Sequence, residues 1–248
     1  MFIFIGTGNY WSLAKDAVDN WNQNLLIGDI KVDFLLLTDR HPRSVWDSIP
    51  YHCMIRYAPK LPFPLPTLLR YHFFLENLDI LENYDYIYFV NADMRIQGKL
   101  DIKELLPQKE YNLVGIQHPG FTVTKEAPIT GTFETNPNST SRLEGWKLAN
   151  GIVLLNVFLT PAYLIGAFQG GRSKQFIDMC KFLKENIDID LKNRVLAIWD
   201  DESHLQRYAQ TMKKFQVLPP TYCQPEGWLS FGPTKILKLQ KNHEEIRS

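Results

Sequence analysis

The chain has 248 residues, of which 45% are hydrophobic and 22% are charged, and its 27 basic and 27 acidic side chains cancel to a formal net charge of +0. These proportions are ordinary for a globular protein and exclude a disordered, collagen-like or coiled-coil chain as the overall structure. The length fits one large α/β domain or two small ones that share a cleft. The charge balance gives no overall attraction to nucleic acid or to an anionic membrane, so neither partner is expected.

Aromatic residues make up 13% of the chain. This proportion is consistent with binding of a carbohydrate or nucleotide, and equally with an aromatic hydrophobic core. Cys53, Cys180 and Cys223 cannot all pair, and none lies in a Cys-X-X-Cys motif, which argues against a disulfide framework and a structural zinc site. A reducing, cytoplasmic compartment is therefore expected. Residues 1–6 are typical of a first buried strand rather than a signal peptide. The apolar stretch 148–168 is interrupted too often to span a membrane.

Short apolar runs alternate with helical patterns in the first hundred residues. Strands are expected at 2–5, 32–37, 55–57 and 86–90, and helices at 10–24 and 67–81, the second capped by Thr67. This alternation predicts a parallel sheet with helices on both faces. Ligands bind beyond the carboxyl ends of the strands in such sheets, so 6–10, Asp39 and 91–93 are expected at one edge.

The second half of the chain gives fewer signals. A strand at 113–116 leads into a turn, and helices are expected at 173–186 and 202–213. The stretch 148–168 is interpreted as a buried strand or helix followed or preceded by a loop. The chain then ends in a basic segment, 235–247.

Gly6 and Gly8 follow the first strand in a Gly-X-Gly turn, which resembles part of a dinucleotide-binding loop. The third glycine of that motif is missing, since its place is taken by Trp11, so a nicotinamide-dependent oxidoreductase is disfavoured. A strand-turn-helix unit beside a nucleotide remains consistent with the sequence, with Tyr10 placed to stack on a base.

Asn91 and Asp93 directly follow the apolar strand 86–90, with one residue between them. Side-chain oxygens in such positions can hold a hard divalent cation on a diphosphate. The alternative is an Asx turn that closes the strand, and the triplet alone does not decide between the two.

Residues 199–204 read Trp-Asp-Asp-Glu-Ser-His and place three acids at a predicted helix start. The helix dipole favours acids there, so capping is one explanation. A glutamate such as Glu202 can instead serve as a nucleophile or cation stabiliser at the anomeric carbon of a sugar. His118, considered alone, is more typical of a structural histidine.

Several segments occur in an order that resembles one known family. They are 86–93, 118–121, 133–134 with 136–139, 166–171, 199–205, 225–228, and 241–243 with Arg247. Together they resemble glycosyltransferase family 6, which contains the histo-blood-group A and B transferases and the α1,3-galactosyltransferases. The Pro-Glu-Gly-Trp segment at 225–228 is more similar to the bacterial or phage members.

The resemblance implies a GT-A fold, an α/β structure with a Rossmann-like mixed sheet flanked by helices, in a single catalytic domain of residues 1–248. Residues up to about 95 would form the nucleotide-sugar half, and the remainder would form the acceptor half with a C-terminal lid. The implied reaction is a retaining transfer of galactose or N-acetylgalactosamine from UDP to a galactoside acceptor in α1,3 linkage. The alternative is a catalytically inactive relative that binds a nucleotide sugar or a glycan.

Carried over position by position, the resemblance makes Glu202 the catalytic carboxylate. The residues that would bind the UDP-sugar donor are Phe4, Ile5, Tyr10, Arg70, Asn91, Asp93, Ile165, Ala167, Lys241 and Arg247. His118 and Trp228 would line the acceptor galactose. Ala167, where a glycine would leave more room, favours galactose over the acetamido sugar.

Asn91 replaces the first aspartate of the family's Asp-X-Asp motif. Mn²⁺ or Mg²⁺ can still bind through Asp93, but neither is expected to be essential, because an amide is a poorer ligand for a hard cation. Lys241 and Arg247, with Lys238 assisting, would then stabilise the leaving diphosphate as the tail closes.

The segment 143–161 is a second departure from the family pattern, since it has no clear counterpart there. The expected partners are a UDP-sugar donor and a glycan acceptor, and no transmembrane segment is expected. The compartment would be the Golgi lumen if the chain is a trimmed catalytic domain.

Overall fold

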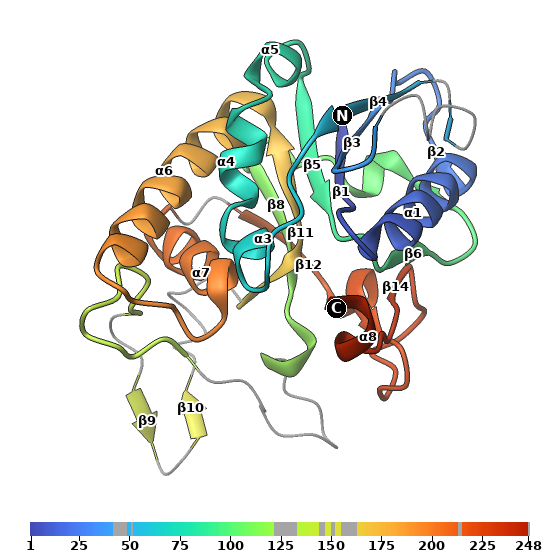
Figure 1. Cartoon of the computed structure of the whole chain (residues 1–248). Coiled ribbons are helices and arrows are strands. Elements are labelled where there is room, and N and C mark those ends of the chain that lie inside the picture. Colours follow the sequence, from blue (N-terminus) through green and yellow to red (C-terminus); the bar gives the residue numbers. More distant parts are fainter. Residues whose placement is uncertain are drawn as a thin grey trace.

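A central sheet with helices on both faces forms the body of the protein (Figure 1). The computed structural model describes residues 1–41, 49–50, 52–121, 133–143, 147–149, 152–154, 163–212 and 215–247, with the backbone alone at 147–149, 152–154 and Arg247.

The central sheet has seven strands in the order β12-β8-β11-β5-β1-β3-β4. Their bounds are β1 (Phe2–Ile5), β3 (Phe34–Thr38), β4 (Cys53–Tyr57), β5 (Tyr86–Val90), β8 (Leu113–Gln117), β11 (Leu164–Arg172) and β12 (Phe215–Leu218). β1 runs parallel to β3 and β5, and β3 runs parallel to β4. β11 runs antiparallel to β5 and β8, while β12 is parallel to β8. The sheet is therefore mixed.

Helices cover the two faces of this sheet, with α1 on one face and α4, α6 and α7 on the other (Figure 1). The helices are α1 (Tyr10–Asn24), α3 (Leu65–Leu68), α4 (Arg70–Leu75), α5 (Leu78–Leu81), α6 (Ser173–Lys192), α7 (Asp200–Met212) and α8 (His243–Arg247). Because successive side chains of a strand point to opposite faces, Phe2 and Phe4 belong to the core under α1, and Ile3 belongs to the core under α4 and α6.

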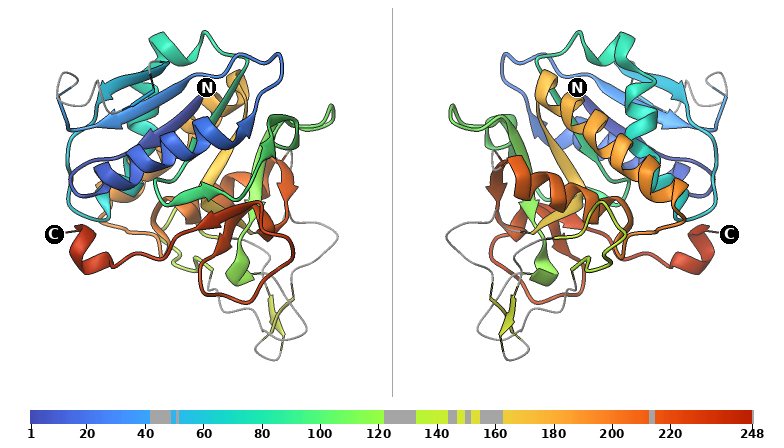
Figure 2. Two further views of the ribbon diagram at one scale, coloured as in Figure 1. Left: turned by 90° about the vertical axis from the view of Figure 1, so that its right-hand side faces the viewer. Right: turned by 90° about the vertical axis from the view of Figure 1, so that its left-hand side faces the viewer.

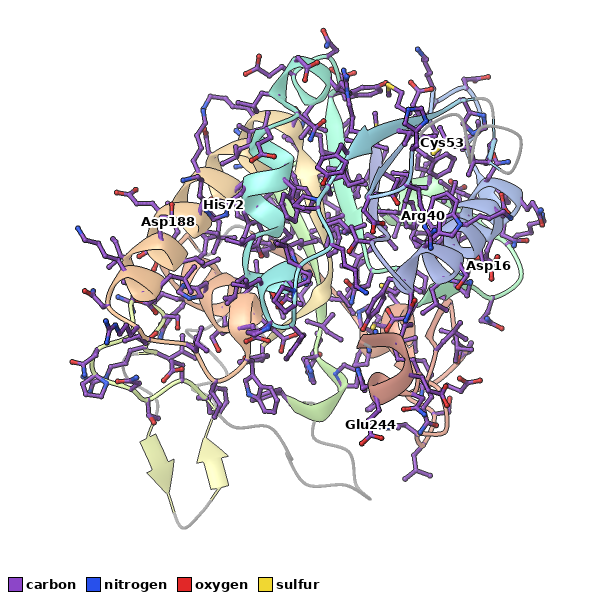
Figure 3. All side chains as sticks on the ribbon, viewed as in Figure 1. Asp16, Arg40, Cys53, His72, Asp188 and Glu244 are labelled. Carbon is purple, nitrogen blue, oxygen red and sulfur yellow. The ribbon has the colours of Figure 1, made fainter. Side chains whose placement is uncertain are left out.

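Each core is closed by aromatic contacts between a helix and the sheet or a second helix. Trp21 on α1 is fully buried and lies 5.2 Å from Phe2, ring centre to ring centre. On the other face, Phe74 of α4 lies 5.8 Å from Phe176 of α6. At the surface of this helix pair, His72 Nε2 lies 2.8 Å from Asp188 Oδ1 (Figure 3).

Short pairings attach the rest of the described chain to this body. They are the three-stranded sheet of β13 (Gln224–Pro225), β14 (Ile236–Lys238) and β6 (Met94–Ile96), the pair β2 (Leu25–Leu26) with β7 (Leu100–Asp101), the hairpin β9 (Lys147–Ala149) with β10 (Ile152–Leu154), and the 3₁₀ turns η2 (Ile102–Glu104), η3 (Pro119–Phe121) and η4 (Pro220–Cys223). β14 pairs antiparallel with β6, which places Lys238 opposite Met94, the residue after Asp93. Figure 2 shows α8 at the end of the tail, close to one end of α1.

The strands predicted in the first hundred residues are confirmed as β1, β3, β4 and β5, with the predicted ends in β1 and β5 and shifted ends in β3 and β4. The parallel arrangement predicted from the first hundred residues is confirmed for β4, β3, β1 and β5. The sheet becomes mixed because β11, from the second half of the chain, inserts antiparallel between β5 and β8. The mixed GT-A-like sheet that the family resemblance implied is confirmed. The helices predicted from 173 and 202 are confirmed as α6 and α7, and the first of them continues to Lys192.

The single helix predicted at 67–81 is wrong, because it is divided into α3, α4 and α5. Leu69 and Asn77 leave helical backbone geometry at the two breaks, with φ/ψ of −91°/6° and −114°/27°. Thr67 lies inside α3, where its hydroxyl donates to the carbonyl of Pro64 at 2.6 Å, so it is not an N-terminal cap.

The apolar stretch 148–168 ends in β11, and its residues 150–151 and 155–162 lie outside the described residues, as does most of the predicted insert 143–161. Among the helices of the described segments, none has the length and apolar character that a membrane crossing requires.

Candidate active site

A cavity of about 240 Å³ opens at the carboxyl ends of β1 and β5, and we call it the strand-end cavity. Five of the predicted donor-binding residues line it: Ile5, Tyr10, Arg70, Asn91 and Lys241. Other parts of the wall come from the proline-rich loop before α3, through Lys60, Leu61 and Phe63, and from His243 and Ile246 of α8. The expectation that 6–10, Asp39 and 91–93 meet at one sheet edge is confirmed. Thr7, Asn9 and Ala92 also line the cavity, and the backbone N–H of Gly8 donates to Oδ1 of Asp39 at 3.0 Å.

A second hollow of about 520 Å³ lies next to the first, and we call it the Trp228 cleft. His118 and Trp228, the predicted acceptor-binding residues, both line it. Ile165, predicted to face the donor sugar, also lines this cleft. Lys241 and His243 line both hollows, so the two adjoin along the C-terminal tail.

Glu202 stands in the first turn of α7, close to residues of both hollows. Its Oε2 accepts a hydrogen bond from the backbone N–H of Gly166 at 2.6 Å. Its Oε1 lies 3.7 Å from Nε2 of His118, a residue of the Trp228 cleft. Burial raises the pKa of Glu202 to about 8, and the neighbouring Asp201 adds to the shift against the Gly166 hydrogen bond.

His118 is a neutral partner for that carboxyl group. Burial lowers the pKa of His118 to about 4, and the charge of Lys238 lowers it further. Nδ1 of the ring accepts a hydrogen bond from the backbone N–H of Gly120 at 2.9 Å, so Nε2 carries the proton of the neutral ring. The hydrogen-bonding side of His118 is therefore directed at Glu202, without a positive charge.

Arg70 connects Glu202 to the strand-end cavity. Its Nη1 donates to the carbonyl of Gly166 at 2.8 Å, the same residue whose N–H binds Glu202. Its Nε lies 3.2 Å from Oδ2 of Asp201, and both side chains are almost completely buried. The guanidinium also stacks 4.6 Å above the ring of Phe89. These contacts fix Arg70 in one orientation.

Asp93 is fully buried beneath the strand-end cavity and is held by two lysines of the tail. Lys241 donates to Oδ2 of Asp93 at 2.6 Å, and Lys238 donates to the same oxygen at 3.2 Å. Burial raises the pKa of Asp93, but the two ammonium groups outweigh it and hold the pKa below its ordinary value. The pKa of Lys238 is raised, because Asp93 outweighs the effect of burial.

This donor set does not fit a tightly held divalent cation. Asp93 is the single carboxylate of residues 91–93, and it already faces two ammonium groups, which would repel a divalent cation. Asn91 offers only a neutral amide. Oδ1 of Asp93 has no hydrogen-bond partner among the described residues, but one oxygen is a poor basis for a metal site. The described part of the chain holds no cluster of three His, Cys, Asp or Glu side chains with metal-binding geometry.

The C-terminal tail lies over the strand-end cavity. The side-chain amide of Asn9 donates to the carbonyl of Glu245 at 3.2 Å, which docks α8 on the start of α1. The ammonium of Lys241 lies 5.3 Å from the ring centre of Tyr10, a cation–π contact across the cavity. The side chain of Arg247, a predicted ligand of the diphosphate, lies outside the described residues.

Four of the described residues predicted to bind the donor do not line this cavity: Phe4, Asp93, Ile165 and Ala167. The side chain of Phe4 is fully buried in the core, between Trp21 and Phe34, because its position in β1 points it toward α1. Ala167 is almost completely buried, and its carbonyl accepts from the backbone N–H of Asn91 at 2.8 Å. The side chains of Phe4 and Ala167 therefore do not line the strand-end cavity, and their part in donor binding stays a prediction.

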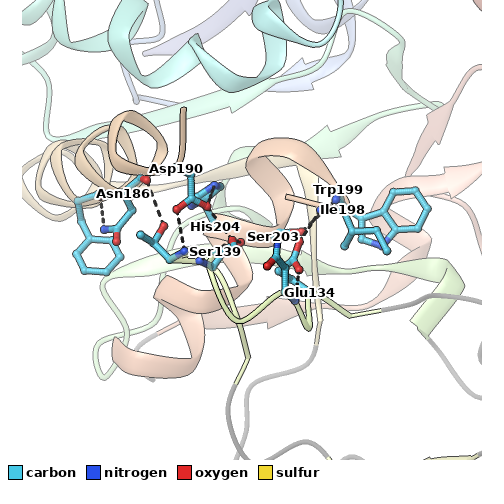
Figure 4. Close-up of polar contacts among 12 residues, drawn as sticks. Glu134, Ser139, Asn186, Asp190, Ile198, Trp199, Ser203 and His204 are labelled. Carbon is cyan, nitrogen blue, oxygen red and sulfur yellow. Dashed lines mark hydrogen bonds and ion pairs between the residues drawn. The ribbon is translucent and has the colours of Figure 1, made fainter. Parts of the chain in front are cut away.

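A buried polar network holds the start of α7 (Figure 4). Glu134 accepts from the backbone N–H of Ile198 at 2.6 Å, and Asp190 of α6 accepts from the hydroxyl of Ser139 at 2.7 Å. Nε2 of His204 lies 3.6 Å from Asp190, and burial lowers the pKa of His204 to about 4, which leaves the ring uncharged at neutral pH. The motif segments 133–139 and 199–205 therefore meet behind Glu202 and fix the helix that carries it.

The sequence did not assign a site role to Asp201, Glu134 or His204, although all three lie in segments of the family pattern. A signal was present for Asp201, which neighbours Glu202 in a run of acids. Gln169 also lies in a segment of the family pattern, whereas Tyr71 carried no signal. Their contacts with Asp201 could not be anticipated, because they form only when α4, β11 and α7 pack together.

The matches to known proteins agree with this arrangement. A model of glycosyltransferase family 6 matches residues 74–248, which is more than half of the chain. The chain belongs to glycosyltransferase family 6. The mixed sheet flanked by helices is consistent with the GT-A-like fold of such a transferase, and its substrates are accordingly a sugar donor and an acceptor.

Similar members of family 6 come from a bacterium and from animals. O-antigen biosynthesis glycosyltransferase WbnI of Escherichia coli is 30% identical over 182 residues, 73% of this chain and 70% of that protein. Histo-blood group ABO system transferase 2 of Rattus norvegicus is 27% identical over 168 residues, 66% of this chain but only 45% of the rat protein. Globoside alpha-1,3-N-acetylgalactosaminyltransferase 1 of Gallus gallus is 31% identical over 93 residues, 35% of this chain and 26% of the chicken protein.

Proposed function

We propose that this family 6 member is a retaining glycosyltransferase that moves galactose or N-acetylgalactosamine from UDP to a galactoside acceptor in α1,3 linkage. The observation that carries the proposal is the position of Glu202. Glu202 lies beside His118, which lines the Trp228 cleft. It also binds Gly166, whose carbonyl is bound by Arg70, a residue of the strand-end cavity. A carboxylate between a donor site and an acceptor site is where a retaining transferase needs one.

The strand-end cavity suits the UDP part of the donor. Tyr10 offers a ring for stacking on the base, as aromatic side chains do in many nucleotide sites. The diphosphate would meet Lys241 and Lys238, whose two positive charges and the one negative charge of Asp93 leave a local excess of +1. Charge-assisted hydrogen bonds from these amines would stabilise the negative charge that develops on departing UDP.

In this proposal Glu202 acts on the other side of the sugar. Its ionised form stabilises the positive charge that develops at the anomeric carbon as the bond to UDP breaks. The acceptor galactoside would lie in the Trp228 cleft, with its apolar face on the indole and its hydroxyls near His118. Residues 1–248 would then act as one catalytic domain, with a donor half, an acceptor half and a closing tail.

The test is release of UDP from UDP-galactose and UDP-N-acetylgalactosamine, with and without a panel of galactosides. Release that depends on the galactoside, with a preference for UDP-galactose, is the expected result. Binding of either nucleotide sugar without acceptor-dependent release would instead identify an inactive sugar-nucleotide-binding relative and overturn the proposal.

The pH dependence of transfer should follow Glu202. Since the pKa of Glu202 is raised to about 8 and the ionised form is the active one, kcat/KM should rise with pH and level off above about pH 8. Below that pH it should fall about tenfold per unit, in step with the ionised fraction. Initial rates at low donor concentration between pH 6 and 9.5 measure this, and a profile that is flat or falls across pH 8 would contradict the assignment.

Transfer should continue in an excess of EDTA, because the lysines on Asp93 take the place that a cation would need. The Asn91→Asp variant adds a second carboxylate and should gain stimulation by Mn²⁺. Rates with EDTA, and with Mn²⁺ added back, measure both effects. Complete loss of activity in EDTA that Mn²⁺ restores in the unaltered protein would make Asp93 a metal ligand.

A further inference from the structure

Tyr71 and Gln169 form a buried hydrogen-bonded pair behind the arginine of the site. Tyr71 follows Arg70 on α4, and Gln169 lies on β11, the strand that also carries Gly166. Both side chains have no exposed surface. Nε2 of Gln169 donates to the hydroxyl oxygen of Tyr71 at 3.0 Å. A glutamine in the middle of a sheet is costly to bury unless its amide is bonded in this way.

This pair reaches the acid beside Glu202. The hydroxyl of Tyr71 lies 3.4 Å from Oδ2 of Asp201 and 3.3 Å from Oε1 of Gln169. Because Gln169 already donates to the Tyr71 oxygen, the hydroxyl proton is available for Asp201. Burial holds the pKa of Tyr71 well above its ordinary value, so the hydroxyl keeps that proton throughout the working range of pH.

We propose that Tyr71 and Gln169 are positioning residues that keep Asp201 ionised and directed at Arg70, and through Arg70 hold the Gly166 peptide against Glu202. The chain of contacts is continuous. Oδ2 of Asp201 faces both Tyr71 and Nε of Arg70, at 3.4 and 3.2 Å. Arg70 binds the carbonyl of Gly166 at 2.8 Å, and Gly166 binds Glu202 at 2.6 Å. The inference rests on the proposed function for what Glu202 and Arg70 do to substrate.

Asp201 needs this support because its ionised and protonated forms are similar in free energy near pH 6. Burial raises the pKa of Asp201 to about 6, and the charge of Asp200 adds to the shift. Arg70 and the Tyr71 hydroxyl act in the opposite direction. On the same helix, Glu202 also faces Asp201, and Tyr163, the residue before β11, faces it from another element. Neither supplies a positive charge. Loss of the Tyr71 hydroxyl should therefore raise the pKa of Asp201 toward neutrality.

The test compares Tyr71→Phe with Tyr88→Phe, a matched control. Tyr88 is equally buried, and its hydroxyl donates at 2.7 Å to the carbonyl of Leu105, away from the site. We expect kcat/KM of Tyr71→Phe to be about tenfold lower near pH 6.5, with the deficit shrinking above pH 8 as Asp201 ionises without help. Tyr88→Phe should have kcat/KM within about twofold of the unaltered protein at every pH.

The pH dependence of the melting temperature provides a readout that does not need turnover. The Tyr71 hydroxyl stabilises only the ionised form of Asp201, so the loss of melting temperature in Tyr71→Phe should be small at pH 5 and larger at pH 8. In Tyr88→Phe the loss should be the same at both pH values, because its acceptor is an uncharged carbonyl. If the unaltered protein transfers no sugar, the proposed function fails. The melting temperatures would still test whether Tyr71 and Gln169 stabilise the ionised form of Asp201.

Gln169→Leu is the second variant, in case Tyr71→Phe does not fold. It removes the donor that fixes the Tyr71 hydroxyl, and we expect the same pH-dependent deficit at about one third of the size. Equal losses of melting temperature at pH 5 and pH 8 in both Tyr71→Phe and Gln169→Leu would show that the pair serves packing alone and would overturn the inference. In that case the kcat/KM deficits would also be independent of pH.

Discussion

Glu202→Gln should retain UDP binding and lose turnover by about a hundredfold or more, the size expected when a charge used only in the transition state is removed. Glutamine keeps the shape of the side chain and an oxygen that can accept from the Gly166 N–H, a bond of 2.6 Å in the unaltered protein. It cannot supply the negative charge that the anomeric carbon needs. Titration with UDP and steady-state kinetics at pH 8.5 measure the two effects separately.

Loss of folding cannot account for that deficit. Because the pKa of Glu202 is raised to about 8 in the folded protein, its contribution to stability is present at low pH and is lost as the pH rises through about 8. A neutral glutamine avoids this loss, so the variant should melt at the same temperature or higher above pH 8. Glu104→Gln is the control and should keep its turnover, because Glu104 accepts from the hydroxyl of Tyr222 and lines neither hollow. Near-normal turnover of Glu202→Gln would remove Glu202 from the mechanism.

Lys241→Met should weaken UDP affinity by about tenfold and reduce turnover by about a hundredfold. The ammonium of Lys241 reaches Asp93 at 2.6 Å and the ring of Tyr10 at 5.3 Å, and it lines both hollows. When UDP enters, the same group is in position to turn from Asp93 to the diphosphate. Methionine keeps most of the length of the stem without the charge.

Lys235→Met makes the same chemical change elsewhere in the tail and is the control. Lys235 pairs with Glu104 at 3.1 Å, so its loss should leave UDP affinity and turnover nearly unchanged. Truncation after Leu239 removes Lys241 together with α8 and should be at least as damaging as the point variant. If both Lys241→Met and the truncation keep normal kinetics, the tail takes no part in catalysis.

The fold could be predicted where its cause is local. Apolar runs at 2–5 and 86–90 predict buried strands, and the strand-end rule brings Tyr10 and Asn91 to one cavity. The break of the 67–81 helix could not be predicted, because it depends on backbone turns at Leu69 and Asn77 that the residue types do not demand.

The site could be predicted only in part, because some of its contacts depend on how distant segments pack together. The order of motifs pointed to Glu202, His118 and Lys241, which all lie at the two hollows or between them. It did not indicate that the side chain of Phe4 is buried in the core, since one position along a strand decides between core and cavity. The pairing of Lys238 with Asp93 depends on the register of β14 against β6, which no local pattern in the sequence specifies.

The anomeric proton of the product tests the central claim most directly. The unaltered protein is incubated with UDP-galactose or UDP-N-acetylgalactosamine and a galactoside, and the new linkage is identified by NMR. We expect a new α-anomeric sugar on O3 of the acceptor galactose, formed with the unaltered protein at pH 8.5 and nearly absent with Glu202→Gln. A β-linked product, or no product from either donor, would contradict it.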